Sequence, residues 1–282
     1  MSLRSYTNLK IAVLSGKGGT GKTFVSVNLA YHIPNASYFD CDVEEPNGQE
    51  YFRGNYTEEI INVKVPQVNH DVCIKCGKCS DFCKYNALAL ILDKVRVFPQ
   101  LCHSCGGCSL VCPVGAISEK DKPIGLVRES IYDGHRIVSG ELHIKEETGV
   151  KIIEHIMNKA DSQGLTVIDC PPGNGCSVME CIRDADYLIL VAEPTIFGLH
   201  NLNMVFELAQ VFSKKVGIVI NKAGDNPMIR EFADDKKIPV LCEIPFDQKM
   251  GYLNSIGEIV AKDKKYSEYF NTIFNKIAEG LA

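Results

Sequence analysis

The sequence predicts an α/β protein in which a mostly parallel sheet is covered by helices on both faces, with a small α+β unit inserted into the chain. Short continuous apolar runs of strand length alternate with longer stretches of helical periodicity, which is typical of parallel strands buried on both sides. The segment Pro66–Ser118 interrupts that alternation and is dense in cysteine. The 282 residues suffice for a substantial core and a small insertion.

Composition and charge argue against several classes of function. The net charge of −5 argues against a protein that coats nucleic acid, because such binding needs an excess of Lys and Arg. No apolar run approaches the ~18 residues that span a bilayer, so we expect no stable membrane insertion. The N-terminus shows no export signal, and the chain holds 13 cysteines. Together these features predict metal binding in a reducing cytoplasm rather than disulfides.

The predicted elements begin with a buried strand at Lys10–Leu14. A glycine-rich loop follows, and then a helix from about Gly21 to Ile33, in which apolar side chains recur at helical spacing. Pro34 ends this helix, and Ser37–Asp40 forms the second strand. A strand, a glycine loop and a helix in this order form the first unit of the expected sheet.

One hairpin and a second series of elements are predicted further along the chain. The hairpin turns at Asp133-Gly134, and the pattern alone assigns it neither to the core nor to the insert. The later elements are helix Val150–Ala160, strand Thr166–Cys170, strand Tyr187–Ala192, helix Phe197–Phe212, strand Val216–Asn221, helix Ile229–Asp235, strand Val240–Ile244 and helix Lys265–Leu281. The apolar stripe of the last helix fits packing on the sheet, although an interfacial membrane anchor would show the same stripe.

The stretch SGKGGTGKT, Ser15 to Thr23, has the context of a phosphate-binding loop: a strand, then G-x-x-x-x-G-K-[ST], then a helix. Glycines let backbone N–H groups surround phosphate oxygens at the positive end of the helix dipole. Lys22 is placed to reach the β- and γ-phosphates, and the Thr23 hydroxyl to bind Mg²⁺. The predicted nucleotide-binding residues of this loop are Gly16, Lys17, Gly18, Gly19, Thr20, Gly21, Lys22 and Thr23.

The residues GKGGTGKT resemble the deviant P-loop ATPases, which include MinD, the plasmid-partition ATPases, the Mrp-type cluster carriers and nitrogenase iron protein. The resemblance extends over most of the chain outside the cysteine-rich segment. DCDVEEPN at Asp40–Asn47 is similar to the first switch region of that family, and DCPPG at Asp169–Gly173 to its second switch. VAEPT and VINKAG follow in the expected order. In particular, the chain resembles MinD-like ATPases with an inserted ferredoxin domain, which implies a P-loop NTPase fold.

This resemblance assigns roles to residues by position. Lys17 matches the signature lysine that in the relatives reaches the nucleotide of a second subunit, which implies a homodimer. Asp42 matches the residue that orients the attacking water, so that Lys17, Lys22 and Asp42 are the predicted catalytic residues. Asp40 and Asp169 match residues that hold the Mg²⁺ shell. Asn221 matches the asparagine that reads adenine.

Each of these roles has a simpler alternative. Lys17 could be a solvated loop lysine, and Asp40 and Asp42 could belong to an acidic turn at the end of a strand. Asn221 could be an ordinary turn residue after a strand. The chemistry favours the assigned roles, because positioning and charge are most of what a protein contributes to phosphoryl transfer.

Two cysteine runs, VCIKCGKCSDFCKYNAL and LCHSCGGCSLVCPVGAI, superpose at an offset of 29 residues and indicate an internal duplication. Each has the C-x₂-C-x₂-C-x₃-C spacing of bacterial ferredoxins, in which the fourth cysteine of one run completes the cluster of the other. The predicted ligands are Cys73, Cys76, Cys79 and Cys112 for one [4Fe–4S] cluster, and Cys102, Cys105, Cys108 and Cys83 for the second. Two zinc sites are the alternative, although zinc motifs usually pair C-x₂-C knuckles across a longer gap.

These observations divide the chain into a P-loop ATPase core at residues 1–65 and 119–282 and an inserted 2[4Fe–4S] ferredoxin-like domain at residues 66–118. Five cysteines lie outside the two runs. The predicted core residues among them are Cys41, Cys170, Cys181 and Cys242. Cys176 lies near the place where nitrogenase iron protein has a cysteine that binds a cluster shared across the dimer, but the second cysteine of such a bridge has no counterpart. His103 is predicted not to be a ligand, because four thiolates suffice.

The cysteine-rich insert lies between the two switch regions in sequence, so that it could sense whether ATP or ADP is bound. We therefore expect an ATPase, slow without a partner, whose homodimer gates electron transfer through two clusters to a partner protein. The expected cofactors are ATP, Mg²⁺ and two [4Fe–4S] clusters. One alternative is a cluster assembly carrier of Mrp type, although that role needs labile ligation. Another is a positioning ATPase with a redox-sensing insert.

Overall fold

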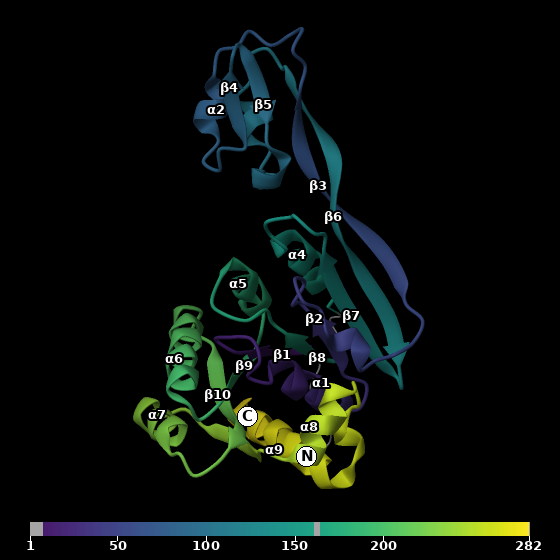
Figure 1. Ribbon diagram of the computed structural model, residues 1–282, viewed down its shortest axis with the longest axis vertical. Helices are drawn as coiled ribbons and strands as arrows, with labels where there is room; N and C mark the ends of the chain where they lie inside the picture. The colour runs from purple at the N-terminus through teal and green to yellow at the C-terminus, as the bar shows by residue number, and fades with distance from the viewer. Residues whose placement is uncertain (1–7, 161–163, 282) are drawn as a thin grey trace.

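A nine-stranded sheet in the order β11-β10-β9-β1-β8-β2-β7-β6-β3 organises the residues that the structure, a computed structural model, describes: 8–160 and 164–281 (Figure 1). Neighbouring strands from β11 to β7 are parallel, and only β6 and β3 add antiparallel pairs at one edge. The parallel strands are β1 (Leu9–Leu14), β2 (Ser37–Asp40), β7 (His135–Leu142), β8 (Leu165–Asp169), β9 (Tyr187–Ala192), β10 (Lys215–Ala223) and β11 (Val240–Pro245).

Helices cover both faces of this sheet. Alternate side chains of β1 show the division, because Ile11 and Val13 join one apolar cluster while Ala12 and Leu14 join the other. One face is packed by α1 (Lys22–His32), α8 (Gln248–Ser255), α9 (Lys264–Leu281) and the short 3₁₀ segment η4 (Val260–Lys262). The other is packed by α4 (Val150–Asn158), α5 (Cys176–Arg183), α6 (Ile196–Val211) and α7 (Met228–Lys236). The predicted α/β architecture with both faces of the sheet covered is thus confirmed.

The C-terminal helix α9 packs in the core, and its apolar stripe is the packed face. Tyr266, Phe270, Ile273 and Ile277 are at most 1% exposed. The ring of Phe270 meets Phe24 of α1 edge to face, with 5.9 Å between the centroids. The packing interpretation of this stripe is confirmed, since a buried face is not available to a lipid surface. Among the described residues, no helix is long and apolar enough to cross a membrane.

Two long strands, β3 (Thr57–Val68) and β6 (Ile117–Tyr132), leave the sheet as an antiparallel ribbon, called here the ribbon (Figure 1). The predicted hairpin at Asp133-Gly134 joins β6 to β7, and both turn residues have positive φ. It therefore belongs to the main sheet, while the other end of β6 extends to the insert. The short 3₁₀ segment η2 (Gly48–Glu50) lies between β2 and the ribbon.

The segment 69–116, called here the cysteine lobe, lies at the far end of the ribbon (Figure 1). Its elements are α2 (Lys78–Phe82), β4 (Leu88–Ile91), β5 (Lys94–Val97), η3 (Pro99–Leu101) and α3 (Gly107–Leu110). It has an apolar cluster of its own, which includes Leu88 and Val95. The duplication is visible in the backbone, since Gly77 and Gly106, 29 residues apart, both have positive φ at the N-caps of α2 and α3. The two cysteine runs thus form the same turn and short helix twice.

Candidate functional site

The glycine-rich loop follows β1 at the carboxyl ends of the parallel strands, where ligands bind in open α/β sheets. Gly19 and Gly21 have φ of 80° and 93°, the left-handed region that favours glycine. A Cβ on Gly21 would also collide with the amide of Asn221, which donates from Nδ2 to the Thr20 carbonyl over 2.8 Å. By contrast, a Cβ on Gly18 or Gly19 would meet nothing within 4 Å. This side of the loop therefore has open space for a ligand.

Lys22, the first residue of α1, is buried between carboxylates. Its Nζ lies 2.7 Å from Asp169 Oδ1 and 3.4 Å from Asp42 Oδ2, and its side chain is 6% exposed. Burial alone lowers the pKa of Lys22, but the charges of Asp169 and Asp42 outweigh it and raise the pKa above its ordinary value. Lys22 is therefore a fixed cation in this site.

Asp40 and Asp169 are paired in register on β2 and β8, and both are fully buried. The two oxygens of Asp40 accept hydrogen bonds from the backbone N–H groups of Asp42 and Gly48, over 3.1 and 2.8 Å. Asp169 Oδ2 accepts a hydrogen bond from the Tyr38 hydroxyl over 2.9 Å. Burial and the charge of Asp169 raise the pKa of Asp40 to about 7, although Lys22 opposes this shift. The strand ends thus concentrate carboxylates around a single ammonium.

Lys17 lies in the same loop as Lys22, but its side chain does not pair with Asp42 or Asp169. Its carbonyl accepts hydrogen bonds from Ser15 Oγ and Thr20 Oγ1, over 2.8 and 3.2 Å, which hold the curl of the loop. Within the described chain, its ammonium has no ion-pair partner. The structure thus brings Lys22, Asp40, Asp42 and Asp169 together and leaves the charge of Lys17 uncompensated.

A pocket of about 190 Å³ adjoins the loop, and Asn221 lines it. Sequence reasoning missed the residues of β11, α8 and the loop between them that complete it: Pro245, Phe246, Asp247, Met250, Gly251 and Asn254. One signal in the sequence could have found them. Phe246 comes directly after a buried strand, and the carboxyl ends of such strands form the edge of the sheet at which ligands bind.

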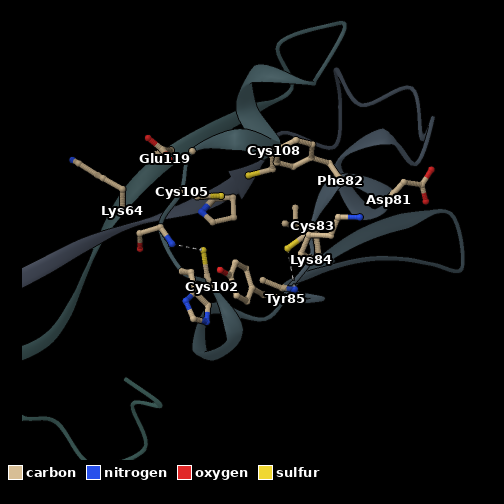
Figure 2. Close-up of a pocket in the computed structure, with 16 residues that line it drawn as sticks. Lys64, Asp81, Phe82, Cys83, Lys84, Tyr85, Cys102, Cys105, Cys108 and Glu119 are labelled. Carbon is tan, nitrogen blue, oxygen red and sulfur yellow. Dashed lines mark hydrogen bonds between the residues drawn. The ribbon is translucent and has the colours of Figure 1, made fainter. Parts of the chain in front are cut away.

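The eight cysteines of the two runs gather as two sets of four, each combining three from one run and one from the other. Cys83, Cys102, Cys105 and Cys108 line a cavity of about 520 Å³, and Figure 2 shows their sulfur atoms around a common space. Cys73, Cys76, Cys79 and Cys112 line a tighter cavity of about 20 Å³. No group of three His, Cys, Asp or Glu side chains converges closely enough to hold a single metal ion, in the part of the chain that the structure describes.

Backbone amides point at the sulfur atoms of both sets. The N–H of Ala87 donates to Cys83 Sγ over 3.3 Å, and the N–H of Ala116 donates to Cys112 Sγ over 3.2 Å. These two contacts are 29 residues apart and therefore repeat in the duplication. Hydrogen bonds to thiolate sulfur stabilise negative charge there.

The remaining cysteines are located as expected. Cys41, Cys170, Cys181 and Cys242 are buried, which confirms their prediction as core residues, whereas Cys176 is exposed at the start of α5. His103 stacks on the ring of Tyr85 with 3.6 Å between the centroids.

Comparisons with known proteins match both parts of the molecule. The family described as CobQ/CobB/MinD/ParA nucleotide binding domain matches residues 11–258. An uncharacterised protein of Methanocaldococcus jannaschii is 33% identical over 96% of this chain and 97% of its own. An iron-sulfur cluster carrier protein of the same organism is 25% identical over 96% of this chain and 84% of its own. A ferredoxin of Pyrobaculum islandicum is 42% identical over 62 residues, which are 22% of this chain and 58% of the ferredoxin.

A solved structure shows the same fold. The cell division ATPase MinD of Pyrococcus furiosus superposes with a TM-score of 0.60 at 19% identity, and the match covers 98% of this chain and all of that one. The predicted P-loop NTPase fold is thereby confirmed.

The raised pKa of Asp40 predicts a pH-dependent stability for the nucleotide-free protein. Between its ordinary pKa of 3.8 and about 7, the folded state keeps a proton on Asp40 that the unfolded state has lost, so that this residue makes the free energy of unfolding decrease as pH rises. Denaturant unfolding of the wild type and Asp40→Asn, at several pH values with a chelator, measures this effect. We expect a smaller decrease in Asp40→Asn; parallel pH profiles would contradict the assignment.

Proposed function

This chain belongs to the CobQ/CobB/MinD/ParA family of nucleotide-binding domains, and on that premise we propose that it is an ATPase whose nucleotide state gates electron transfer through two [4Fe–4S] clusters. The observation that carries the proposal is that one chain contains two different kinds of site. A phosphate loop with its cation and carboxylates lies in the core, and two sets of four thiols lie in the cysteine lobe.

The proposed ATP site comprises the open face of the glycine loop, Lys22 and the pocket that contains Asn221. Phosphates at this loop would compete with Asp169 and Asp42 for the Lys22 ammonium. Asp40, Asp169 and Thr23 would hold Mg²⁺, directly or through water, and the ion would neutralise charge on the β- and γ-phosphates. The carboxylates that a nucleotide frees from Lys22 are suited to that cation, because oxygen ligands are what Mg²⁺ prefers.

In the proposed hydrolysis, a water oxygen attacks the γ-phosphorus, and the bond to the bridging oxygen of ADP breaks. Asp42 would orient that water from its position beside Lys22, where its side chain is 16% exposed and thus reachable. Lys17 has no ion-pair partner within the described residues and would reach the nucleotide of a second subunit. A cation supplied across an interface offsets charge that develops on the transferred phosphoryl group. The active form would then be a homodimer.

The two cysteine sets fit the proposed clusters in donor type, number and pairing. Each offers four thiols, three of one run and one of the other, as in two-cluster ferredoxins. A bound cluster would accept and release single electrons. The backbone N–H groups that point at Cys83 and Cys112 would tune its potential.

Electron transfer is preferred over cluster donation because each cluster would be fixed by both cysteine runs at once. Releasing one cluster would require parting the two halves of the cysteine lobe, which share one apolar cluster. The second candidate, an ATP-dependent cluster carrier, is favoured by a different observation: the cluster carrier of M. jannaschii matches this chain over 96% of its length. Incubation of the loaded protein with an apo-acceptor separates the two, since only a carrier would transfer its iron.

The dimer proposal predicts that Lys17→Ala retains ATP binding but loses hydrolysis. The fall in kcat should be at least ~10-fold, because a cation supplied across an interface typically contributes more than that. Lys214→Ala is the control, since the ammonium of this lysine contacts the carbonyls of Arg183 and Ala185, outside the phosphate loop. Phosphate release and nucleotide titration measure both properties. Unchanged kcat in Lys17→Ala would remove this residue from the mechanism.

The cluster proposal predicts about eight iron and eight sulfide atoms per anaerobically reconstituted chain, and about half of each in Cys105→Ser. Cys176→Ser should match the wild type, because this exposed cysteine belongs to neither set of four. Iron and acid-labile sulfide assays with EPR of the reduced protein provide the measurement. Stoichiometric zinc without sulfide would refute the assignment, and loss of iron in Cys176→Ser would point to a shared cluster.

A further inference from the structure

We propose that Lys122 is a positioning residue that transmits the state of the nucleotide loop to the loop carrying Cys102. This inference rests on the proposed function and names how its two sites would be coupled. Three consecutive contacts carry it: one from Val43 to the end of β7, one from the following turn to Lys122, and one from Lys122 to the cysteine lobe.

The first contact begins directly beside the nucleotide site. Asp42 contacts Lys22, and the next residue, Val43, is 2% exposed. The Val43 carbonyl accepts a hydrogen bond from the N–H of Leu142 over 2.7 Å. The Val43 side chain fills the space over Gly149, where a Cβ would collide with it. A displacement of Asp42 would therefore shift the segment 142–149, because a packed interior transmits such movements.

The second contact joins that segment to the ribbon. His143 donates its N–H to the carbonyl of Ile124 over 2.9 Å, which fixes the turn against β6. Three residues later, Glu146 pairs with Lys122, with Oε2 and Nζ 2.6 Å apart. Both side chains are largely buried, at 15% and 18% exposed. Such a pair is screened less than the Lys64–Asp121 pair of the same ribbon, whose side chains are 56% and 63% exposed.

The third contact reaches the cluster ligands. The Lys122 ammonium also donates to the carbonyl of Pro99 over 3.3 Å. Pro99 begins η3 (Pro99–Leu101), and Cys102 follows η3 directly. The N–H of Ser104 donates to Cys102 Sγ over 3.5 Å, a contact drawn in Figure 2. One ammonium therefore touches both the turn that follows β7 and the loop that positions a proposed ligand.

The surroundings leave room for this loop to move. Beside Lys122 lies a cleft of about 400 Å³ between the cysteine lobe and the core. Cys102 and His103 line it from the cysteine lobe, and Glu147 and Cys176 line it from the core. Lys151, also in this cleft, pairs with Glu154 on its own helix and does not bridge the two parts. The cleft separates the cysteine lobe from the core beside Lys122. A movement of Glu146 that is passed on through Lys122 can therefore displace η3 relative to the core.

Hydrogen–deuterium exchange of the iron-loaded protein tests this inference, with Mg-ADP and a non-hydrolysed Mg-ATP analogue compared. In the wild type, the change of nucleotide should alter exchange both in residues 41–48 and in residues 100–105. Lys122→Met should keep the first change and lose the second. Lys122→Arg should restore it, since Arg can reach the same carboxylate and carbonyl. The matched control is Lys120→Met, which removes an exposed lysine from the same face of β6 and should behave as wild type.

The inference is overturned if Lys122→Met keeps the change at residues 100–105, or if the wild type shows none there. A merely structural Lys122 would give the first of these results, together with faster exchange in both nucleotide states. Iron content and nucleotide binding, measured on the same samples, report on the proposed function separately. A protein with full iron and ATP binding but without the response at 100–105 refutes the coupling alone, whereas missing iron or nucleotide refutes the proposed function.

Discussion

The ammonium of Lys22, buried between the carboxylates of Asp169 and Asp42, is the interaction on which the rest of the site depends. Parallel pairing of β2 with β8 places Asp40 and Asp169 side by side out of water, and charges so arranged need a cation. Lys22 supplies that cation, and burial beside Asp169 raises the pKa of Asp40 to about 7. A ligand that attracts the ammonium would release Asp42, and the proposed coupling starts from that change.

The position of the cysteine lobe determines how a change at the nucleotide loop would reach the thiols. It lies at the end of a two-stranded ribbon, across a cleft from the first residues of α4 and α5 (Figure 1). The ribbon alone would transmit a movement of the core poorly to the cysteine lobe, because most side chains of β3 are exposed and few are packed. The largely buried contact at Lys122 adds a second route, which begins at Val43 within the first proposed switch region. Nucleotide and thiol sites are thereby joined by packed and hydrogen-bonded residues rather than by the ribbon only.

Much of this could be predicted from the sequence where local patterns decide the outcome. The continuous apolar strands, the glycine loop and the helices α1, α4, α6, α7 and α9 were predicted to within two residues at their ends. The short helices α5 and α8 were missed, because eight residues carry little periodicity. The ribbon was missed because β3 alternates apolar and polar side chains only over Ile61–Val65, which is too short a stretch to indicate a strand of 12 residues. The contact of Val43 with Leu142 joins residues about a hundred positions apart, and no local pattern indicates such a pair.

The most direct measurement of the central claim, that nucleotide state is coupled to the cysteine lobe, is an anaerobic redox titration of the iron-loaded protein monitored by EPR. It is performed once with Mg-ADP and once with a non-hydrolysed Mg-ATP analogue. Tenfold coupling between nucleotide and cluster corresponds to a shift of about 59 mV for a one-electron step. We predict a reproducible difference in midpoint potential between the two states. Superimposable curves, with both nucleotides shown to be bound, would contradict the account.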